Sequence, residues 1–439
     1  MYVIRLAGRL LFASAVLGAA AGCELIFPST VAPPTDAGAP DAPVRSDARV
    51  QPEGGAQYND IDQPSYWSFF DTTAVSPRAS GFAGAAFDGR YVYLVPQNAA
   101  GTGAVVTRYD KTMTFVNPAS WSTFDPTTVL VDGGTLGFNG GTFDGRYVYL
   151  VPLETGVAVQ YDTQASFSST TSWSTFDTRT LSSGTEGFAG AAFDGTYVYL
   201  VPNQVGSSPS STVLRYNPTA PFGAQLSWST FDASATGPGA AGFVGAVFDG
   251  RYIYFVPNLF SIILRYDVKG QFGAAASWTA LDTNLVIVNE QGFFGGVFDG
   301  DFIYLVPHTG GVVARFDTRL ELEAQAAWSQ FDTTSLSPQA AGFSGGAFDG
   351  RYVYLVPFND GALDGVVARY DTTLSFTTAS AWSTFGVNTL GSSAQGFVGG
   401  LFDGSYIYLV PGVNGTVARF NASTAPVTLG LPAFHGSFY

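Results

Sequence analysis

A single unit of about 50 residues repeats along most of the chain, and no other feature limits the fold as strongly. Its first marker is a tryptophan, and the seven tryptophans lie 50 to 55 residues apart, at Trp67, Trp121, Trp173, Trp228, Trp278, Trp328 and Trp382. Its second marker is Phe-Asp-Gly, which begins at seven similarly spaced positions, Phe87, Phe143, Phe193, Phe248, Phe298, Phe348 and Phe402. A period of this length is typical of a propeller or a solenoid, in which each repeat buries its apolar surface against its neighbours.

The sixth unit indicates which architecture the repeat builds. Asp349-Gly350 separates two apolar runs, and this dipeptide predicts a two-residue type I′ hairpin, since both central residues need a positive φ. Pro357 ends the second run because proline donates no hydrogen bond to a sheet. The unit therefore predicts four strands, over Gly342–Phe348, Arg351–Val356, Gly365–Asp371 and Trp382–Phe385. Seven such units, with no convincing helix, predict an all-β fold, a seven-bladed β-propeller of four-stranded antiparallel blades.

The composition agrees with one ring better than with several domains. At about 150 residues per domain, the length alone would suggest two or three domains. The 53 glycines are explained if small residues such as Gly345 and Gly346 crowd round the central axis. The aromatic content of 15% is explained if large side chains pack between sheets, as we expect for Phe343, Phe348, Tyr352, Tyr354 and Trp382.

The two ends of the repeat predict how the ring closes. The first marker, Trp67, belongs to an isolated fourth strand over Tyr66–Asp71, whereas the last unit, Gly396–Asn421, has three strands and no tryptophan. We expect the N-terminal strand to complete the last blade, because this removes the open edge of the ring. The alternative is closure by the C-terminal tail, where Val427–Leu431 has the composition of a strand.

The unit resembles the kelch repeat over about residues 66–421. It has an Asp-Gly turn, a Tyr-Val-Tyr strand, a Tyr-Asp pair that ends the third strand and a tryptophan that opens the fourth, in the sixth unit Tyr370-Asp371 and Trp382. It departs from the kelch pattern where Val356-Pro357, and its counterpart in every copy, replaces the Gly-Gly doublet. The resemblance implies a propeller that binds proteins, as most of that family do, or one of the family's few enzymes.

The N-terminal part of the sequence predicts a targeting signal followed by a spacer. Residues 1–22 combine Arg5 and Arg9 with an apolar run and a small-residue end, which is typical of a secretory signal peptide. The run ends in Ala20-Ala21-Gly22-Cys23, which resembles the lipobox of bacterial lipoproteins, although Ala20 stands where leucine is usual. The resemblance implies that Cys23, the sole cysteine, carries a lipid, and Glu24 in place of aspartate favours the outer membrane. The alternative is an ordinary signal peptide followed by a free thiol.

We therefore expect four segments and a location in the bacterial cell envelope, periplasmic or surface-exposed. They are a lipoprotein signal peptide at 1–22, a flexible Pro/Asp/Ala-rich linker at 23–64, the propeller at 65–421 and a tail packing on it at 422–439. The formal net charge of −15 argues against a nucleic-acid partner, which needs clustered Lys and Arg. One Cys and two His argue against a multi-His or Cys metal site, so no cofactor is expected.

Charges that recur in nearly every unit are expected to be structural, because a catalytic site needs one asymmetric arrangement. We expect an arginine in the third strand to face an aspartate at the end of the fourth across their hairpin. The arginines are Arg108, Arg215, Arg265, Arg315, Arg369 and Arg419, with Gln160 in the remaining unit. The aspartates are Asp71, Asp125, Asp177, Asp232, Asp282 and Asp332, with Gly386 as the exception. The aspartates of the Asp-Gly turns should serve the turn, since they lack the spacing of a calcium loop.

The loops that differ between units are the better candidates for ligand binding. Those after Val-Pro and those before Gly-Phe are expected on one face, as a polar, mildly acidic rim around the channel mouth. The predicted ligand-binding rim comprises Asn98, Glu154, Glu186, Asn203, Asn258, Gln291, His308, Asn359 and Gln395. Amides and carboxylates without a nucleophile or a metal suit hydrogen-bonded recognition of a glycan or a peptide.

These observations predict no catalytic residue and no metal ligand. Our hypothesis is a membrane-tethered binding or scaffold module for a protein or polysaccharide outside the cytoplasm. One alternative is an extracytoplasmic carbohydrate-active hydrolase or lyase, for which Glu154, Glu186 and Glu290 are available as a carboxylate pair. The other alternative is a structural envelope protein.

Overall fold

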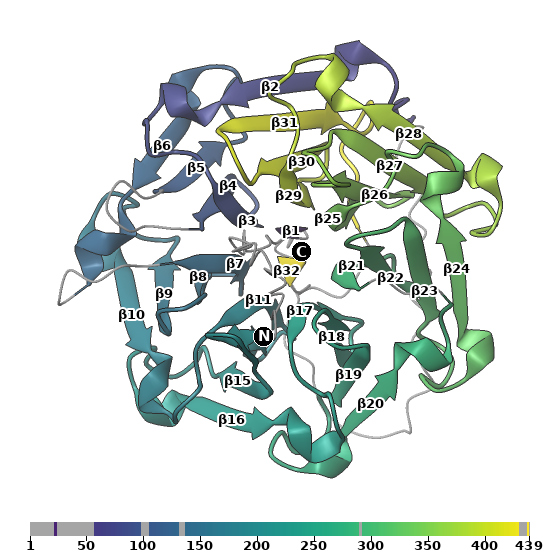
Figure 1. Cartoon of the computed structure of the whole chain (residues 1–439). Coiled ribbons are helices and arrows are strands. Elements are labelled where there is room, and N and C mark those ends of the chain that lie inside the picture. The colour runs from purple at the N-terminus through teal and green to yellow at the C-terminus, as the bar shows by residue number, and fades with distance from the viewer. Residues whose placement is uncertain are drawn as a thin grey trace, which may run out of the picture.

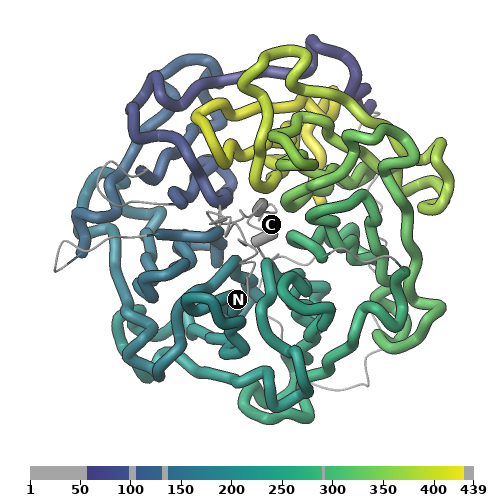
Figure 2. Tube along the Cα trace, in the orientation of Figure 1, coloured from purple at the N-terminus to yellow at the C-terminus, as the bar shows by residue number. Residues whose placement is uncertain are grey.

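The computed structural model is a seven-bladed β-propeller, as the repeat predicts (Figure 1). It describes residues 22–23, 57–97, 105–130, 137–288, 292–429 and 437–438. Within these ranges the elements are strands and short 3-10 helices, and none of the helices is a candidate to cross a membrane. Each blade is a four-stranded antiparallel sheet, and the blades succeed one another round the axis in chain order (Figure 2).

From the axis outward, the strands of each blade follow one another in chain order, and blade seven takes its outermost strand from the N-terminal part of the chain. Blades one and two are β3 (Phe82–Phe87), β4 (Tyr91–Pro96), β5 (Val106–Asp110), β6 (Trp121–Phe124), and β7 (Phe138–Phe143), β8 (Tyr147–Pro152), β9 (Val157–Asp162), β10 (Trp173–Asp177). Blades three and four are β11 (Phe188–Phe193), β12 (Val198–Pro202), β15 (Thr212–Tyr216), β16 (Trp228–Asp232), and β17 (Phe243–Phe248), β18 (Tyr252–Pro257), β19 (Ile262–Asp267), β20 (Trp278–Asp282). Blades five and six are β21 (Phe293–Phe298), β22 (Phe302–Pro307), β23 (Val312–Asp317), β24 (Trp328–Asp332), and β25 (Phe343–Phe348), β26 (Tyr352–Pro357), β27 (Val366–Asp371), β28 (Trp382–Gly386). Blade seven is β29 (Phe397–Phe402), β30 (Tyr406–Pro411), β31 (Thr416–Asn421) and β2 (Trp67–Asp71).

Two short ladders lie outside the blades. A hairpin in blade three pairs β13 (Gln204–Val205) with β14 (Ser208–Pro209). Near the axis, β1 (Gly22–Cys23) pairs antiparallel with β32 (Ser437–Phe438) (Figure 1).

Short 3-10 helices flank the fourth strand of each blade. Those that precede its tryptophan are η2 (Pro64–Tyr66), η4 (Pro118–Ser120), η6 (Thr170–Ser172), η8 (Gln225–Ser227), η10 (Ala275–Ser277), η12 (Gln325–Ala327) and η14 (Ala379–Ala381). Those that follow the strand are η3 (Thr72–Ala74), η5 (Pro126–Val129), η7 (Thr178–Thr180), η9 (Ala233–Thr236), η11 (Thr283–Leu285), η13 (Thr333–Ser335) and η15 (Val387–Thr389).

The N-terminal strand closes the ring, which confirms the expected closure. Strand β2 pairs antiparallel with β31, in the register Trp67 opposite Phe420 and Asp71 opposite Thr416. The C-terminal tail supplies no strand at 427–429, and residues 430 and 431 lie outside the described part. Val427 is instead buried, and its N–H donates to the Gly404 carbonyl.

The hairpin between the two inner strands differs from the prediction by one residue. The central residues of the loop are Gly350 and Arg351, because the Asp349 N–H donates to the Tyr352 carbonyl. Gly350 has φ +100°, and a glycine at the first central position is typical of a type II′ turn rather than type I′. The carboxylate of Asp349 explains the shift, since it accepts from the N–H groups of Arg351 and Tyr352 and from the Tyr354 hydroxyl. The turn aspartate is thus structural, as expected.

The innermost strands need small residues for a reason that the sequence alone did not give. Each is irregular at its third residue, and in blade six the register shifts between Phe343 and Gly346. A Cβ at Gly346 would collide with the carbonyl oxygen of Tyr354 on the next strand of the same blade. Glycine therefore allows close backbone approach at the bulge, in addition to relieving crowding at the axis.

Aromatic rings join each blade to the next. The tryptophan of one blade stacks on the fourth-strand phenylalanine of the preceding blade, and Trp173 lies on Phe124 with ring centroids 4.2 Å apart and an interplanar angle of 3°. Its indole Nε1–H donates to the Phe167 carbonyl six residues earlier. In blade four the phenylalanine position is taken by Leu281, so Trp328 has no ring there. The expectation of sheet-on-sheet aromatic packing is confirmed.

The expected pairing of third-strand arginines with fourth-strand aspartates is wrong. The register places Ser122 opposite Arg108, and Arg108 Nε donates to its hydroxyl at 3.1 Å. The Arg108 guanidinium lies over the rings of Tyr91 and Phe167, each 4.1 Å from the centroid. Asp125 instead accepts from the Thr127 N–H and so caps a 3-10 helix.

The ion pair that recurs among the blades joins the arginine of the hairpin turn to the aspartate at the end of the third strand. In blade one, Arg90 of the hairpin turn contacts Asp110 at the end of the third strand, with an N–O distance of 2.6 Å. Burial alone would raise the pKa of Asp110, but hydrogen bonds from Arg90 and Thr112 outweigh it and lower the pKa to about 2. Equivalent pairs join Arg146 to Asp162, Arg251 to Asp267 and Arg351 to Asp371. These recurring charges therefore link the hairpin turn to the third strand in blades one, two, four and six.

Candidate functional site

The ring has two faces of different character. The turn face carries the Asp-Gly hairpins, and the loop face carries the loops that follow the second and the fourth strands. The two sets of loops meet as the sequence predicts, because in every blade except blade four the residue after Val-Pro donates its N–H to the carbonyl of the glycine of Gly-Phe in the same blade, and in blade four the next residue, Leu259, does so. Examples are Leu153 to Gly137 at 2.8 Å and His308 to Gly292 at 3.0 Å.

Three residues of the predicted rim connect neighbouring blades. Asn203 Nδ2 donates to the Phe243 carbonyl at 2.8 Å, and Asn258 Nδ2 donates to the Phe293 carbonyl at 3.1 Å. His308, at the same position of the next blade, has a hydrogen bond to the backbone of Phe343. The donors of these side chains are therefore engaged within the ring, where they link neighbouring blades.

The other predicted rim residues are spread over the loop face. Glu154 is exposed, and Glu186, Asn359 and Gln395 are half-buried. Asn359 accepts from the Gly361 N–H through Oδ1. Asn98 and Gln291 lie outside the described residues, as does Glu290, the third acid of the hydrolase alternative.

His308 is the one rim residue with acid–base chemistry near neutral pH. Its ring lies 4.2 Å from that of Phe294, and burial holds its pKa below the ordinary value of histidine. Its Nδ1 is buried and has no hydrogen-bond partner. Across the described ranges, no three His, Cys, Asp or Glu side chains gather into a metal site.

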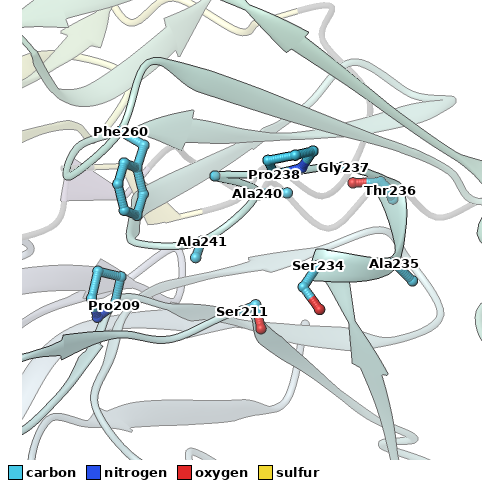
Figure 3. A pocket seen from close by; sticks show the side chains of 11 residues that line it. Pro209, Ser211, Ser234, Ala235, Thr236, Gly237, Pro238, Ala240, Ala241 and Phe260 are labelled. Atoms are coloured by element: carbon cyan, nitrogen blue, oxygen red, sulfur yellow. The ribbon is translucent and has the colours of Figure 1, made fainter.

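A pocket of about 660 Å³ opens between blades three and four on the loop face (Figure 3). Its walls come from the end of β14 and the residue before β15, from η9 and the loop after it, and from the loop between β18 and β19. It is lined by Pro209, Ser211, Ser234, Ala235, Thr236, Gly237, Pro238, Gly239, Ala240, Ala241 and Phe260.

The chemistry of this pocket is neutral and mixed. Figure 3 shows Phe260 on one side and the hydroxyls of Ser234 and Thr236 on the other. Phe260 is 45% exposed, which is unusual for a phenylalanine in this ring. The Ser211 hydroxyl donates to Asp232, so its oxygen lone pairs are what it offers to a ligand. An exposed aromatic face opposite hydroxyl groups suits a ligand with both apolar and hydroxyl faces.

A second hollow, of about 810 Å³, lies between blades two and three on the turn face. Its charged lining residues are already engaged within the blade. Asp144 accepts from the N–H groups of Arg146 and Tyr147 and from the Tyr149 hydroxyl, while Arg146 contacts Asp162. The pocket beside Phe260, which we call the blade 3/4 pocket, is therefore the better candidate site.

Sequence reasoning missed the blade 3/4 pocket because it looked for polar residues at two loop positions. Two signals point to it. Leu259-Phe260 is an apolar pair just after the Val-Pro position, and Gly237-Pro238-Gly239 is an unusual run after the fourth strand. Gly239 has φ +78°, and a Cβ there would lie 3.3 Å from Ile262 Cγ1, so glycine allows this wall to approach blade four.

No known protein family and no curated protein matches this sequence. Among solved structures, the chain is similar to virginiamycin B lyase from Staphylococcus aureus, with a TM-score of 0.55, 12% identity, and coverage of 81% of this chain and 98% of the lyase. It is also similar to YCF48 from Cyanidioschyzon merolae, with a TM-score of 0.52, 14% identity, and coverage of 81% and 99%. Raptor from Chaetomium thermophilum matches with a TM-score of 0.52 and 11% identity, covering 84% of this chain and 30% of that one.

These similarities define the protein as a seven-bladed β-propeller and go no further. At such identities the fold is shared, while activities differ between proteins of one fold. One of these structures is a lyase and the others carry no enzyme name, so the comparison favours neither an enzyme nor a binding protein. The kelch resemblance stays a prediction.

Proposed function

We propose that the protein is a lipid-tethered binding module outside the cytoplasm, and that its ligand is a neutral polysaccharide held at the blade 3/4 pocket. The observation that carries the proposal is the pocket itself, whose eleven lining residues include no charged side chain, three hydroxyls and one exposed aromatic ring. Sugars present C–H faces that pack on aromatic rings and hydroxyls that exchange hydrogen bonds with Ser and Thr. A protein ligand is the second candidate, since the kelch resemblance implies one.

The segment that leads into the propeller lies on the face opposite the pocket. Residues 57–61 lie on the turn face, where the Tyr58 hydroxyl donates to the Asp349 carbonyl and Arg369 Nη1 donates to the Asn59 carbonyl at 2.8 Å. The Asn59 N–H also donates to the Ala422 carbonyl at 2.9 Å, which ties the two ends together. The propeller therefore begins on the turn face, opposite the loop face that carries the pocket.

Replacing Phe260 with alanine tests the ligand assignment. We expect the purified protein to bind one or more neutral glycans on a glycan array, and Phe260→Ala to weaken that binding at least tenfold. The reason is loss of the aromatic wall, since stacking on an aromatic ring contributes on the order of 1 kcal/mol or more. Isothermal titration calorimetry with the best glycan from the array would measure the change.

Leu226→Ala is the matched control, because Leu226 is fully exposed at 100% and lies outside the pocket. It should bind as the unaltered protein does. Equal binding by Phe260→Ala would remove the ligand from this pocket, and release of shortened sugar products would replace the binding module with the hydrolase or lyase alternative. Absence of any glycan signal would favour a protein ligand.

The tether has its own test at Cys23. If Cys23 carries a lipid, Cys23→Ala should move the protein from the membrane fraction to the soluble fraction of the producing bacterium, because the acyl chains are then absent. Immunoblotting of separated fractions would measure the ratio. An unchanged membrane fraction would contradict the anchor.

A further inference from the structure

The loop between the second and third strands of blade six is longer than the equivalent loops of blades two, four, five and seven. It runs over residues 358–365, whereas the equivalent loop of blade five has only residues 308–311. The longer loop is held by its own contacts, since Asn359 forms a bridge with Leu363. It carries two carboxylates, Asp360 and Asp364.

Asp364 has one oxygen in use and one without a partner. Oδ1 accepts from the N–H of Gly365 at 2.7 Å and from that of Val366 at 3.2 Å. Oδ2 is buried and meets no hydrogen-bond donor, although the residue is only 5% exposed. A buried carboxylate oxygen without a donor is costly to keep, so its presence calls for an explanation.

The turn that Asp364 forms does not need a carboxylate. Asn414 occupies the same position before the third strand of blade seven, and its Oδ1 accepts from the Thr416 N–H at 2.8 Å. The same position is Ser210 in blade three and Gly310 in blade five. The alignment follows from one recurring hydrogen bond, in which the carbonyls of Ser210, Gly310 and Asp364 accept from the N–H groups of Gly242, Gly342 and Gly396. Three other blades therefore build this turn with a neutral residue, and the charge of Asp364 serves some other purpose.

The second carboxylate adds negative charge to the same loop. Burial raises the pKa of Asp364 to about 6, and the nearby charge of Asp360 adds to the rise. No arginine or lysine of the described ranges forms an ion pair with either residue. The loop thus presents two carboxylates, one of them with a buried free oxygen, and no ion-paired cation within the described ranges to balance them.

We propose that Asp364 and Asp360 bind a calcium ion on the loop face of blade six. Calcium is coordinated by carboxylate, amide and carbonyl oxygens and by water, usually six to eight in total. Asp364 supplies Oδ2 and Asp360 supplies its exposed carboxylate, and oxygens of the loop backbone and water complete the shell. With only two protein carboxylates, the affinity belongs to the weak, extracellular range of about 0.1 to 1 mM.

Calcium titration of the full-length protein, first stripped with EDTA and dialysed, tests the site. We expect isothermal titration calorimetry to show one calcium ion per chain, and 10 mM CaCl₂ to raise the melting temperature by a few degrees, since an ion that binds only the folded state stabilises it. Asp364→Asn keeps the turn, as Asn414 does in blade seven, and should abolish both the heat and the shift. Asp360→Asn, at an exposed position, should weaken binding at least tenfold.

Glu323→Gln is the control, because Glu323 is an exposed acid on the turn face of blade five and should not affect the titration. An unaltered protein without calcium-dependent heat or melting shift would overturn the proposal. So would undiminished binding in both aspartate variants, which would place the ion elsewhere. An equal melting shift with 10 mM MgCl₂ would overturn the assignment to calcium.

Discussion

Deleting residues 65–72 is expected to abolish the cooperative unfolding transition of the propeller. These residues contain β2, which supplies the fourth strand of blade seven and shields β31 from solvent. Trp67 stacks on Phe385 of blade six at 5.8 Å, and Phe70 stacks on Trp121 of blade one at 4.7 Å. The deletion therefore removes one strand and both aromatic contacts at the blade where β2 closes the ring.

Differential scanning calorimetry would measure the transition, and circular dichroism would show whether β-structure survives. A ring with an open edge exposes unpaired N–H and C=O groups along β31, so we also expect aggregation of the deleted chain. The matched control removes eight residues, 36–43, from the Pro-rich segment and should leave the transition unchanged. A normal transition in the 65–72 deletion would assign closure to the C-terminal tail instead.

The repeat made most of the fold predictable. Each unit carries its own turn signal and tryptophan, so strand number, strand order and closure by Trp67 followed from spacing alone. The strands β25 to β28 begin and end within one residue of their predicted bounds. The turn type was missed because the sequence does not show that the Asp349 carboxylate binds backbone N–H groups ahead of it. That contact is decided by three-dimensional geometry.

The side-chain pairing was harder to predict because it depends on register and on the neighbouring blade. Arg108 and Asp125 occur at a constant spacing, but Ser122 is the residue opposite the arginine. The arginine also lies on Phe167, which belongs to blade two and is distant in sequence. Contacts between blades of this kind are invisible to reasoning within one unit.

The candidate site was the least predictable part, because it arises from differences between units that are small in sequence. Asn203 and Asn258 were predicted to bind a ligand through their amides, whereas in the structure their side-chain N–H groups donate to backbone carbonyls of the next blade. Phe260 looked like an ordinary apolar residue, and the structure leaves it exposed beside a pocket. Exposure of an aromatic ring depends on how adjacent loops pack, which no single repeat encodes.

The second large effect is expected for Trp173→Ala in the contact between blades one and two. The indole is buried, lies on Phe124 at 4.2 Å and on Tyr161 at 4.5 Å, and its Nε1–H donates to the Phe167 carbonyl. Removing a buried tryptophan leaves a cavity and an unpaired carbonyl, and such changes cost about 3 to 5 kcal/mol of unfolding free energy. Urea denaturation followed by circular dichroism would measure the loss.

The contact of Trp328 in blade five serves to measure how much ring stacking contributes to the expected loss of stability. Trp328 holds the equivalent position in blade five, but Leu281 stands where Phe124 stands for Trp173. An offset-stacked ring pair contributes about 0.5 to 1.5 kcal/mol beyond burial, so Trp328→Ala should be less destabilising than Trp173→Ala by about that amount. Phe124→Leu should remove the same increment and bring the blade one to two contact to the strength of the natural Leu281 contact. Equal losses for the two tryptophan variants would mean that burial, and not stacking, stabilises the contact between blades.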